Sequence, residues 1–360
     1  MLIGQASIEQ GANNLLINCA ELTSGDRLLI VSEGPDYDYY DPEMVTAVAE
    51  VARGIGANVI IKKIAFDPTT TSVNAELHEV IEYADKTVFL SRLGDQLRFG
   101  DLWGGKRTVI SYALDCQMLG SAYGTSHYHA FTRLKAAIDR MLMRAESIVV
   151  TCPKGTRFAG KGLATGLQLQ DVGITRFPMQ VFAPIPASGF SGVVALPGFL
   201  VGTGSKYYHP YALQYEGQLF AHFKDNRIEG FSGTSSAVAA AKTHYQSVAD
   251  KFNIDRDFVH SWHAGIHPSC AFPGPAKGSF ERWSGSAFGN PRLLHFHTCG
   301  AYPPGEICWN VVDPTICVDG IAVWKDGKLH AEAIAGGAEI LLEYSCVRAA
   351  FAAPSRQIGL

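Results

Sequence analysis

Short apolar β-type runs alternate with helical patterns over the first 146 residues, and this alternation constrains the fold more than any other feature. Arg27–Ser32 and Asn58–Ile64 are apolar, β-rich runs of strand length. Between them, Asp41 and Pro42 provide an N-cap and a first-turn proline for a helix that extends to about Gly56. Such strand–helix–strand units align their strands in parallel, with helices on both faces of the sheet. We therefore predict an α/β fold that begins with a parallel-sheet, three-layer domain.

The same alternation continues to residue 146. Thr87–Leu90 and Arg107–Tyr112 are predicted strands, and Asn74–Ala84 and His129–Arg144 are predicted helices. A dinucleotide site requires a strand, a glycine turn and a helix in that order. The glycines at 54 and 56 instead precede a strand, which is typical of a helix end. The domain is thus predicted to be Rossmann-like without a dinucleotide.

The sequence changes in character at Ser147. Glycine and proline become frequent, and β-type segments occur at Gln180–Ala183, Gly192–Leu196 and Leu219–Phe223, with one clear helix at Ser235–Phe252. A chain of 360 residues is long enough for two domains of about 100–200 residues each. We predict an α/β domain at 1–146 and a β-rich α+β domain, which carries the functional site, at 147–360.

Composition excludes several classes of function. The formal net charge is -4 and no basic run is present, which argues against a nucleic-acid partner. No apolar run reaches the roughly 18 residues of a membrane span, and the first 22 residues lack the pattern of a signal peptide. The eight cysteines are scattered without a CxxC pair, which favours reduced thiols. We expect a soluble cytoplasmic protein without membrane association.

Histidines concentrate in one stretch of the second domain. Five of the 12 histidines lie between His260 and His297. Imidazole is a common ligand for zinc, iron and copper. His295 and His297 are two residues apart, so on a strand both would lie on one face and could reach one metal. The pattern indicates a metal centre; a metal-free polar pocket and purely structural histidines are the alternatives.

The carboxylates nearest to this stretch are candidates for ligands or bases. They are Glu281, Glu306, Asp313 and Asp319. Asp319 precedes a glycine and is predicted to lie in a turn. Asp313 precedes a proline, so it is either a turn residue or a ligand or general base. Cys308 is either a buried apolar residue or a soft ligand and nucleophile.

Four segments together resemble a known superfamily. It joins the metallo-aminopeptidases of the aminopeptidase T type with the iron-dependent 2,5-dihydroxypyridine 5,6-dioxygenases. The segments are SIVVTCPKGTRF at 147–158, LFAHFKDNRIEGFSG at 219–233, HAGIHP at 263–268 and CWNVVDPTICVDGIAVWKDGKL at 308–329. The resemblance extends over most of the chain and implies the two-domain α/β fold described above.

The resemblance also implies ligand positions. His263 falls where the dioxygenases have a histidine ligand and the aminopeptidases a glutamate, so the chain is more similar to the dioxygenase branch. His295 falls near a histidine that the aminopeptidases use. The closing strand of both branches carries a His-x-Asp ligand pair, where this chain has Cys308-Trp309-Asn310.

This departure leaves two interpretations open. In the first, His263, His295 and His297 hold the metal with Asp313 as the carboxylate, and His267 acts as acid or base. The metal would be divalent, Fe(II) by preference, with Zn or Mn as alternatives. In the second, the metal has been lost and Cys308 or a histidine serves as base in the same pocket. The first is favoured, because converging histidines without a cation repel each other when protonated.

Three functions follow from these interpretations. The first is a metal-dependent enzyme that cleaves or oxidises a small hydroxylated aromatic or N-heteroaromatic ring, with Tyr207, Tyr208 and Tyr215 as candidates to line its pocket. The second is a metal-dependent hydrolase, either aminopeptidase-like or acting on a cyclic amide. The third is a degenerate, non-catalytic relative that binds a small molecule or serves as an assembly subunit. The resemblance further implies a homo-oligomer.

Overall fold

The computed structural model describes residues 4–34, 38–100, 106–163, 169, 171–203 and 206–360. The chain divides into two compact units of interleaved segments. Unit 1 comprises residues 1–132, 172–180 and 344–353, and unit 2 comprises residues 133–171, 181–343 and 354–360. The two units are the parts of the chain with the most internal contacts. The boundary between two domains at residue 147 stays a prediction. No helix in the described residues is long and apolar enough to cross a membrane.

Unit 1 is built on the predicted parallel sheet. Its strands are β1 Arg27–Glu33, β2 Asn58–Ile64, β3 Lys86–Leu90, β4 Arg107–Ser111 and β7 Thr175–Phe177. Every neighbouring pair is parallel, and the order across the sheet is β2-β1-β3-β4-β7. The helices are α1 Gln5–Asn13, which continues as a π-helical turn at Asn14–Cys19, α2 Pro42–Ile55, α3 Ala75–Tyr83, α4 Leu93–Gln96, α5 Cys116–Gly120, α6 Ala122–Thr125 and α11 Ser345–Ala352.

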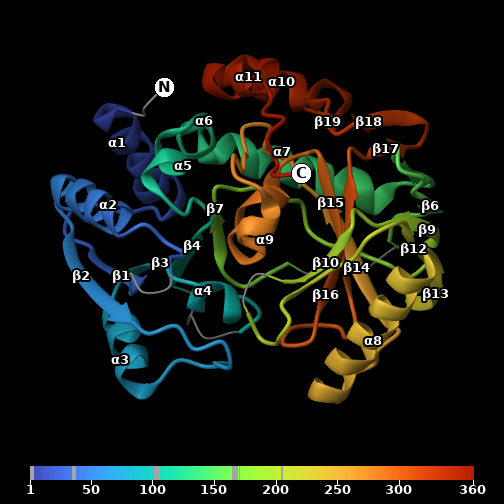
Figure 1. The fold of residues 1–360 in the computed structure, drawn as a ribbon. Helices are drawn as coiled ribbons and strands as arrows, with labels where there is room; N and C mark the ends of the chain where they lie inside the picture. The colour runs from blue at the N-terminus through green and yellow to red at the C-terminus, as the bar shows by residue number, and fades with distance from the viewer. Residues whose placement is uncertain (1–3, 35–37, 101–105, 164–168, 170, 204–205) are drawn as a thin grey trace. The chain divides into compact units, whose positions relative to one another are not determined.

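Helices lie on both faces of this sheet, as the alternation predicts. The connection from β1 to β2 runs in the opposite direction across the sheet from that between β2 and β3, so right-handed crossovers place α2 and α3 on opposite faces. Figure 1 shows them on opposite sides of the strands. Leu29 and Val31 of β1 pack with Leu77 and Ile81 of α3 in one apolar cluster. The predicted three-layer arrangement is confirmed.

Helix caps explain where these helices begin. The side chain of Asp41 accepts a hydrogen bond from the backbone N–H of Glu43 at the start of α2, and Asn74 does the same for Leu77 of α3. Helix α2 ends at Gly56, whose φ of 94° lies in the left-handed region that glycine adopts without strain. The glycines at 54 and 56 thus belong to a helix end, as predicted.

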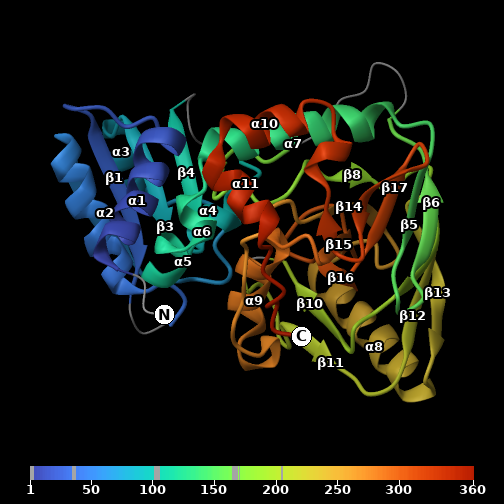
Figure 2. The same cartoon turned by 90° about the horizontal axis from the view of Figure 1, so that it is seen from above.

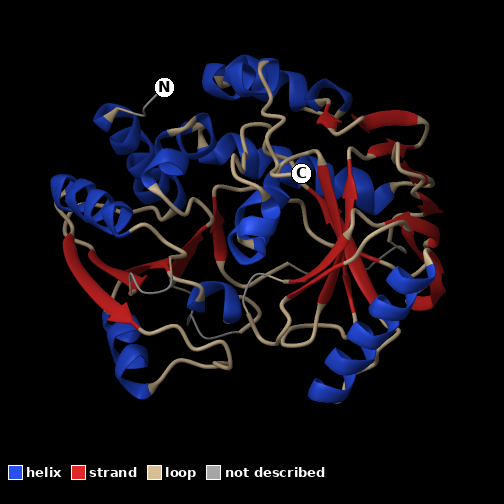
Figure 3. Cartoon of the chain, in the orientation of Figure 1, coloured by secondary structure: helices blue, strands red, loops and turns tan. Residues whose placement is uncertain are grey.

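Unit 2 contains two sheets in which all neighbouring strands of the described residues pair antiparallel. The six-stranded sheet has the order β11-β10-β16-β15-β14-β8, and the eight-stranded sheet has the order β13-β12-β9-β6-β5-β17-β18-β19. Figure 3 shows how strands dominate this part of the chain. The strands are β5 Ile148–Thr151, β6 Arg157–Gly160, β8 Ile185–Pro186, β9 Ser191–Ala195, β10 Phe199–Gly202, β11 Ala212–Gln214, β12 Leu219–Lys224, β13 Arg227–Gly233, β14 Val259–Ala264, β15 Leu293–Thr298, β16 Ile307–Val312, β17 Thr315–Val318, β18 Ile321–Lys325 and β19 Lys328–Leu329.

Few helices accompany these sheets. They are α8 Ser235–Phe252, α9 Phe280–Ser286 and α10 Gly337–Glu343, while α7 Tyr128–Arg144 belongs to both units. Figure 2 shows β14, β15 and β16 side by side, in agreement with their pairing. The predicted β-rich second region is therefore confirmed, although Gln180–Ala183 forms only a single bridge at Val181 instead of a strand.

An aromatic core joins the two sheets of unit 2. Phe158 of β6 contacts Trp262 of β14 and Phe296 of β15 edge-to-face, with ring centroids 5.6 and 5.1 Å apart. Phe223 of β12 meets Phe296 and Trp309 in the same way. Side chains alternate between the faces of a strand. The residues next to these aromatic positions on β14, β15 and β16 therefore face away from this core.

Candidate metal centre

Three histidines lie on that other face of the six-stranded sheet. His263 of β14 pairs directly with His295 of β15, so both side chains lie on the same face. His297 is two residues further along β15 and shares this face. The strand geometry therefore brings them together without any unusual backbone, because a His-x-His on one strand and a histidine on its neighbour converge in an antiparallel pair.

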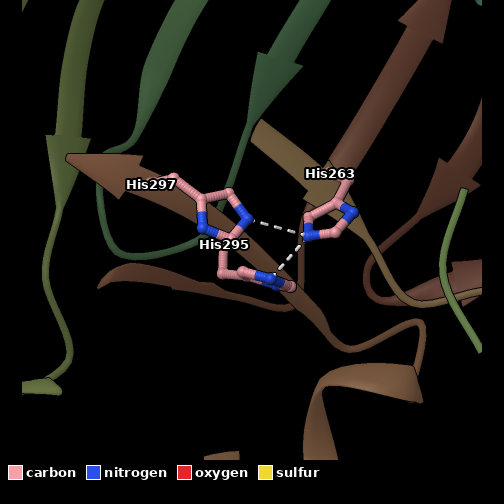
Figure 4. Close-up of side chains that lie close together, drawn as sticks. All are labelled: His263, His295 and His297. Atoms are coloured by element: carbon pink, nitrogen blue, oxygen red, sulfur yellow. Dashed lines mark hydrogen bonds between the residues drawn. The ribbon is translucent and has the colours of Figure 1, made fainter. Parts of the chain in front are cut away.

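The ligand atoms of the three rings converge closely. Nε2 of His263 is 2.6 Å from Nε2 of His295 and 3.1 Å from Nε2 of His297. Figure 4 shows the three rings turned toward one another. One ligand atom from each residue lies within 4.8 Å of the other two. Within the described residues, no other three histidine, cysteine or carboxylate side chains meet in this way. All three rings are buried; His297, the most exposed, keeps 9% of its surface.

The contact of His263 with a carbonyl determines where its proton lies. Nδ1 of His263 is 3.0 Å from the backbone carbonyl oxygen of Phe182. A carbonyl oxygen only accepts, so Nδ1 carries the hydrogen and donates it. In the neutral ring, Nε2 is then a bare lone pair directed at the other two histidines. Holding one ring nitrogen with a carbonyl is the usual way in which proteins orient a histidine ligand.

A carboxylate takes the corresponding position behind His297. Oε1 of Glu306 lies 3.1 Å from Nδ1 of His297, within ion-pair distance, although the angle departs from that of a well-formed hydrogen bond. The other oxygen of Glu306 accepts a hydrogen bond from the Thr203 hydroxyl, and the Tyr208 hydroxyl donates to the Glu306 backbone carbonyl at 2.7 Å. A carboxylate at Nδ1 favours the proton there, which leaves Nε2 of His297 as a second lone pair.

This donor set fits a divalent metal. Two lone pairs 3.1 Å apart repel each other unless a proton or a cation lies between them. Nitrogen ligands about 2.0–2.1 Å from one metal are roughly 2.8–3.4 Å apart when neighbouring ligands are at right-angled or tetrahedral positions. The separation between His263 and His297 falls in that range. The 2.6 Å separation from His295 is shorter, so a few tenths of an ångström of movement would be needed there.

The surroundings of the three rings are largely apolar. Phe288 stacks on His295, with ring centroids 4.1 Å apart and planes inclined by 24°. His260 lies at a β-bulge in β14, and its Nδ1 is 2.7 Å from the Ser261 hydroxyl. Burial lowers the pKa of His260, with a further lowering by His297 that Glu306 opposes. A ligand at this site would therefore exchange water for aromatic rings and a few polar groups.

The predicted carboxylate ligand lies elsewhere. Asp313 is at the turn between β16 and β17, with a φ of 52°, so the turn interpretation is confirmed. Its carboxylate accepts from Nε and Nη2 of Arg292 at 2.6 Å each, and from Arg356 at 3.1 Å. The Asp313 carboxylate thus accepts hydrogen bonds from two guanidinium groups, and it is not part of the histidine group. Glu306 is the carboxylate that the structure places beside the histidines.

The two predicted catalytic residues are both buried. His267 lies in the loop after β14, where its backbone N–H donates to the carbonyl of Gly289 at 2.9 Å, and its ligand atoms are outside the histidine group. Cys308 pairs with His297 across β15 and β16, so it shares the face of the histidines. It also packs in an apolar cluster with Val201 and Leu293. Their roles as acid, base or nucleophile stay predictions.

Sequence reasoning named Glu306 as a nearby carboxylate but did not single it out. It precedes β16 directly, and the pairing of β16 with β15 sets Ile307 opposite Thr298, next to His297. The sequence signal for Glu306 is this register: an acidic residue at the start of the strand that follows the His-x-His strand.

Two of the three candidate tyrosines have hydrogen bonds that place them. The Tyr208 hydroxyl donates to the backbone carbonyl of Glu306, and the Tyr215 hydroxyl accepts from the Gly198 N–H at 3.2 Å.

Comparison with known proteins gives likeness of fold only. No family model and no curated protein matches the sequence. The structure is similar to the 2,5-dihydroxypyridine dioxygenase from Pseudomonas putida KT2440, with a TM-score of 0.58 and 16% identity over 92% of this chain and 99% of that one. It is also similar to the wild-type AmpT from Thermus thermophilus, with a TM-score of 0.52 and 12% identity over 90% and 99% of the two chains. These likenesses, both below 25% identity, show that the chain shares the fold of the two proteins.

Proposed function

We propose that the chain is a metal-dependent enzyme acting on a small hydroxylated aromatic or N-heteroaromatic ring, in the manner of a 2,5-dihydroxypyridine dioxygenase. The observation that carries this proposal is the convergence of three buried imidazoles, two of them with their second nitrogen oriented by an acceptor. The likeness of the fold to a dioxygenase supports the choice of substrate class. We propose Fe(II), with Zn or Mn as alternatives.

His263, His295 and His297 would hold the metal through Nε2. When bound, it would supply a positive charge that attracts the oxygens of a hydroxylated ring. The protein's own contribution is orientation: Phe182 fixes the ring of His263, and Glu306 supports His297. Phe288, stacked on His295, covers one face of that ring and excludes water from it.

A hydrolase is the second candidate, and the donor set itself favours it. Three histidines with no carboxylate among the converging atoms form a set that also occurs in zinc sites whose open position holds water. The likeness to AmpT points in the same direction. Substrate oxidation and hydrolysis differ in a measurable way, because ring cleavage by a dioxygenase incorporates both atoms of one O2 per substrate and hydrolysis uses none.

The test begins with protein purified without a His tag. We expect about one divalent metal per chain by mass spectrometry, and uptake of one O2 per 2,5-dihydroxypyridine consumed at an oxygen electrode. Metal without oxygen uptake, together with cleavage of a cyclic amide or an aminoacyl amide, would favour the hydrolase. Protein that holds no stoichiometric metal after reconstitution with iron, zinc or manganese would refute both enzymes and favour a non-catalytic binding protein.

Glu306 provides a separate prediction. Replacement by glutamine keeps the size of the side chain but removes the charge behind His297, so the metal affinity is expected to fall by about 10–100-fold. Affinity is measured by competition with a metal chelator. Glu339→Gln, at an exposed position of α10, is the matched control and should bind metal as the wild type does. An unchanged affinity in Glu306→Gln would show that this carboxylate does not support the centre.

A further inference from the structure

Asn310 extends the row of site residues by one strand. It lies on β16 and pairs directly with His295, which pairs with His263 on β14. Directly opposite residues of antiparallel strands carry their side chains on the same face, with Cβ atoms about 4.5–5.5 Å apart. The amide of Asn310 is therefore an immediate neighbour of the histidine group and faces the same side of the sheet.

The amide of Asn310 has no hydrogen-bond partner in the described part of the chain. The residue is fully buried, and both Oδ1 and Nδ2 lack a partner. Two other buried asparagines behave differently: Asn14 and Asn290 each donate two hydrogen bonds through Nδ2 and accept through Oδ1. Buried polar groups in folded proteins are almost always satisfied. An amide left without partners beside a cluster of converging nitrogens therefore indicates a partner outside the protein.

We propose that Asn310 selects the substrate at this site by pairing with an amide-like edge of the ring, and this rests on the proposed function. A carboxamide presents one N–H donor and one carbonyl acceptor side by side. Its complement is a ligand with a ring N–H next to a carbonyl, as in a 2-pyridone or another lactam. A 2-hydroxypyridine takes that form as its lactam tautomer. The substrate class is thus a hydroxylated N-heterocycle, and a carbocyclic phenol is excluded.

The apolar surroundings make this pairing selective. Cys308, on the same face of β16, belongs to an apolar cluster that includes Phe288 and Trp283, and Phe288 stacks on His295. A ligand that lacks the ring N–H or the carbonyl would leave the buried amide of Asn310 unpaired. Sites that hydrogen-bond a substrate group reject analogues without it by about 10⁴–10⁵-fold when the group is fully buried. Discrimination against a carbocyclic analogue should therefore exceed about 100-fold.

The test compares two probes on two proteins. 2,5-Dihydroxypyridine has the lactam edge, and hydroquinone has the same para-hydroxyl pattern without it. Calorimetry without oxygen on metal-loaded protein should show at least about 100-fold tighter binding of 2,5-dihydroxypyridine to the wild type, and less than about 10-fold discrimination in Asn310→Leu. Metal content, measured on the same samples, should be equal in the two proteins.

Thermal unfolding without metal provides a second measurement that does not depend on the proposed function. Asn310→Leu removes two unpaired polar groups, so its Tm should rise by about 2–4 °C. Asn14→Leu is the matched control, because the same change there removes satisfied hydrogen bonds and should lower the Tm. A lower Tm in Asn310→Leu would overturn the proposal by showing that the amide has protein partners.

The remaining outcomes separate the two proposals. Unchanged discrimination in Asn310→Leu with normal metal content would overturn the role of Asn310 alone. A loss of metal in this variant would also overturn it, because the amide would then be a metal ligand. Wild-type protein that takes up no metal would refute the proposed function instead. In that case, tighter binding of 2,5-dihydroxypyridine than of hydroquinone by the metal-free protein, lost in Asn310→Leu, would still support the pairing.

Discussion

Replacing His263 by alanine is expected to reduce the bound metal from about one per chain to less than about one tenth, with a corresponding loss of ring-cleaving activity. His263 stands between the other two histidines, since its Nε2 is 2.6 Å from that of His295 and 3.1 Å from that of His297. Without it only two imidazoles remain. The effect should exceed the roughly 10–100-fold loss of affinity that follows removal of a group behind a ligand.

The control and the measurement make this prediction specific. His129→Ala changes an exposed histidine of α7 and should bind metal as the wild type does. Metal content by mass spectrometry and folding by circular dichroism are measured on all three proteins. Because the pairing of β14 with β15 is made by backbone groups, loss of the His263 side chain should leave the sheet intact. A folded His263→Ala protein with full metal content would refute the centre.

The convergence of the histidines could be predicted in part because it depends on local geometry. The two-residue repeat of a strand places His295 and His297 on one face wherever that strand lies. The approach of His263 requires one further fact, the pairing of β14 with β15, and no local pattern encodes it. The position of Glu306 depends on the next pairing, of β15 with β16. The sequence therefore predicts which residues share a face within one strand, but not which strands pair with each other.

The position of Asp313 outside the histidine group has a physical cause. The prediction that Asp313 is a ligand rests mainly on its closeness in sequence to the histidines. In the structure, Arg292 instead donates two parallel hydrogen bonds to the Asp313 carboxylate.

The short parallel strand Thr175–Phe177 has no sequence prediction for a different reason. It has only three residues and shows no periodicity, and its place in the sheet beside β4 follows from a pairing between segments far apart in the chain. Longer apolar, β-rich runs, such as Asn58–Ile64, predict strands with the observed bounds.

Replacing the buried Glu33 by alanine is expected to lower the free energy of unfolding by about 3–5 kcal/mol. Glu33 ends β1, and its carboxylate lies 2.9 Å from Nη2 of Arg92, which follows β3; their side chains are 2% and 4% exposed. The Arg92 guanidinium is further enclosed by Phe66 and Tyr39, whose ring centroids lie 3.4 and 4.7 Å away. Removing the carboxylate would break this buried ion pair.

A double replacement separates this explanation from simple loss of packing. If the broken ion pair is what destabilises Glu33→Ala, then Glu33→Leu combined with Arg92→Met should recover most of the lost free energy, because two apolar side chains of similar volume need no ion-pair partner. The exposed pair Arg133–Glu343 provides the reference: Glu343→Ala should change stability by less than about 1 kcal/mol. Urea unfolding measures all four proteins. Equal destabilisation of the single and the double variant would show that the buried pair is required for its hydrogen bonds and not merely for charge balance.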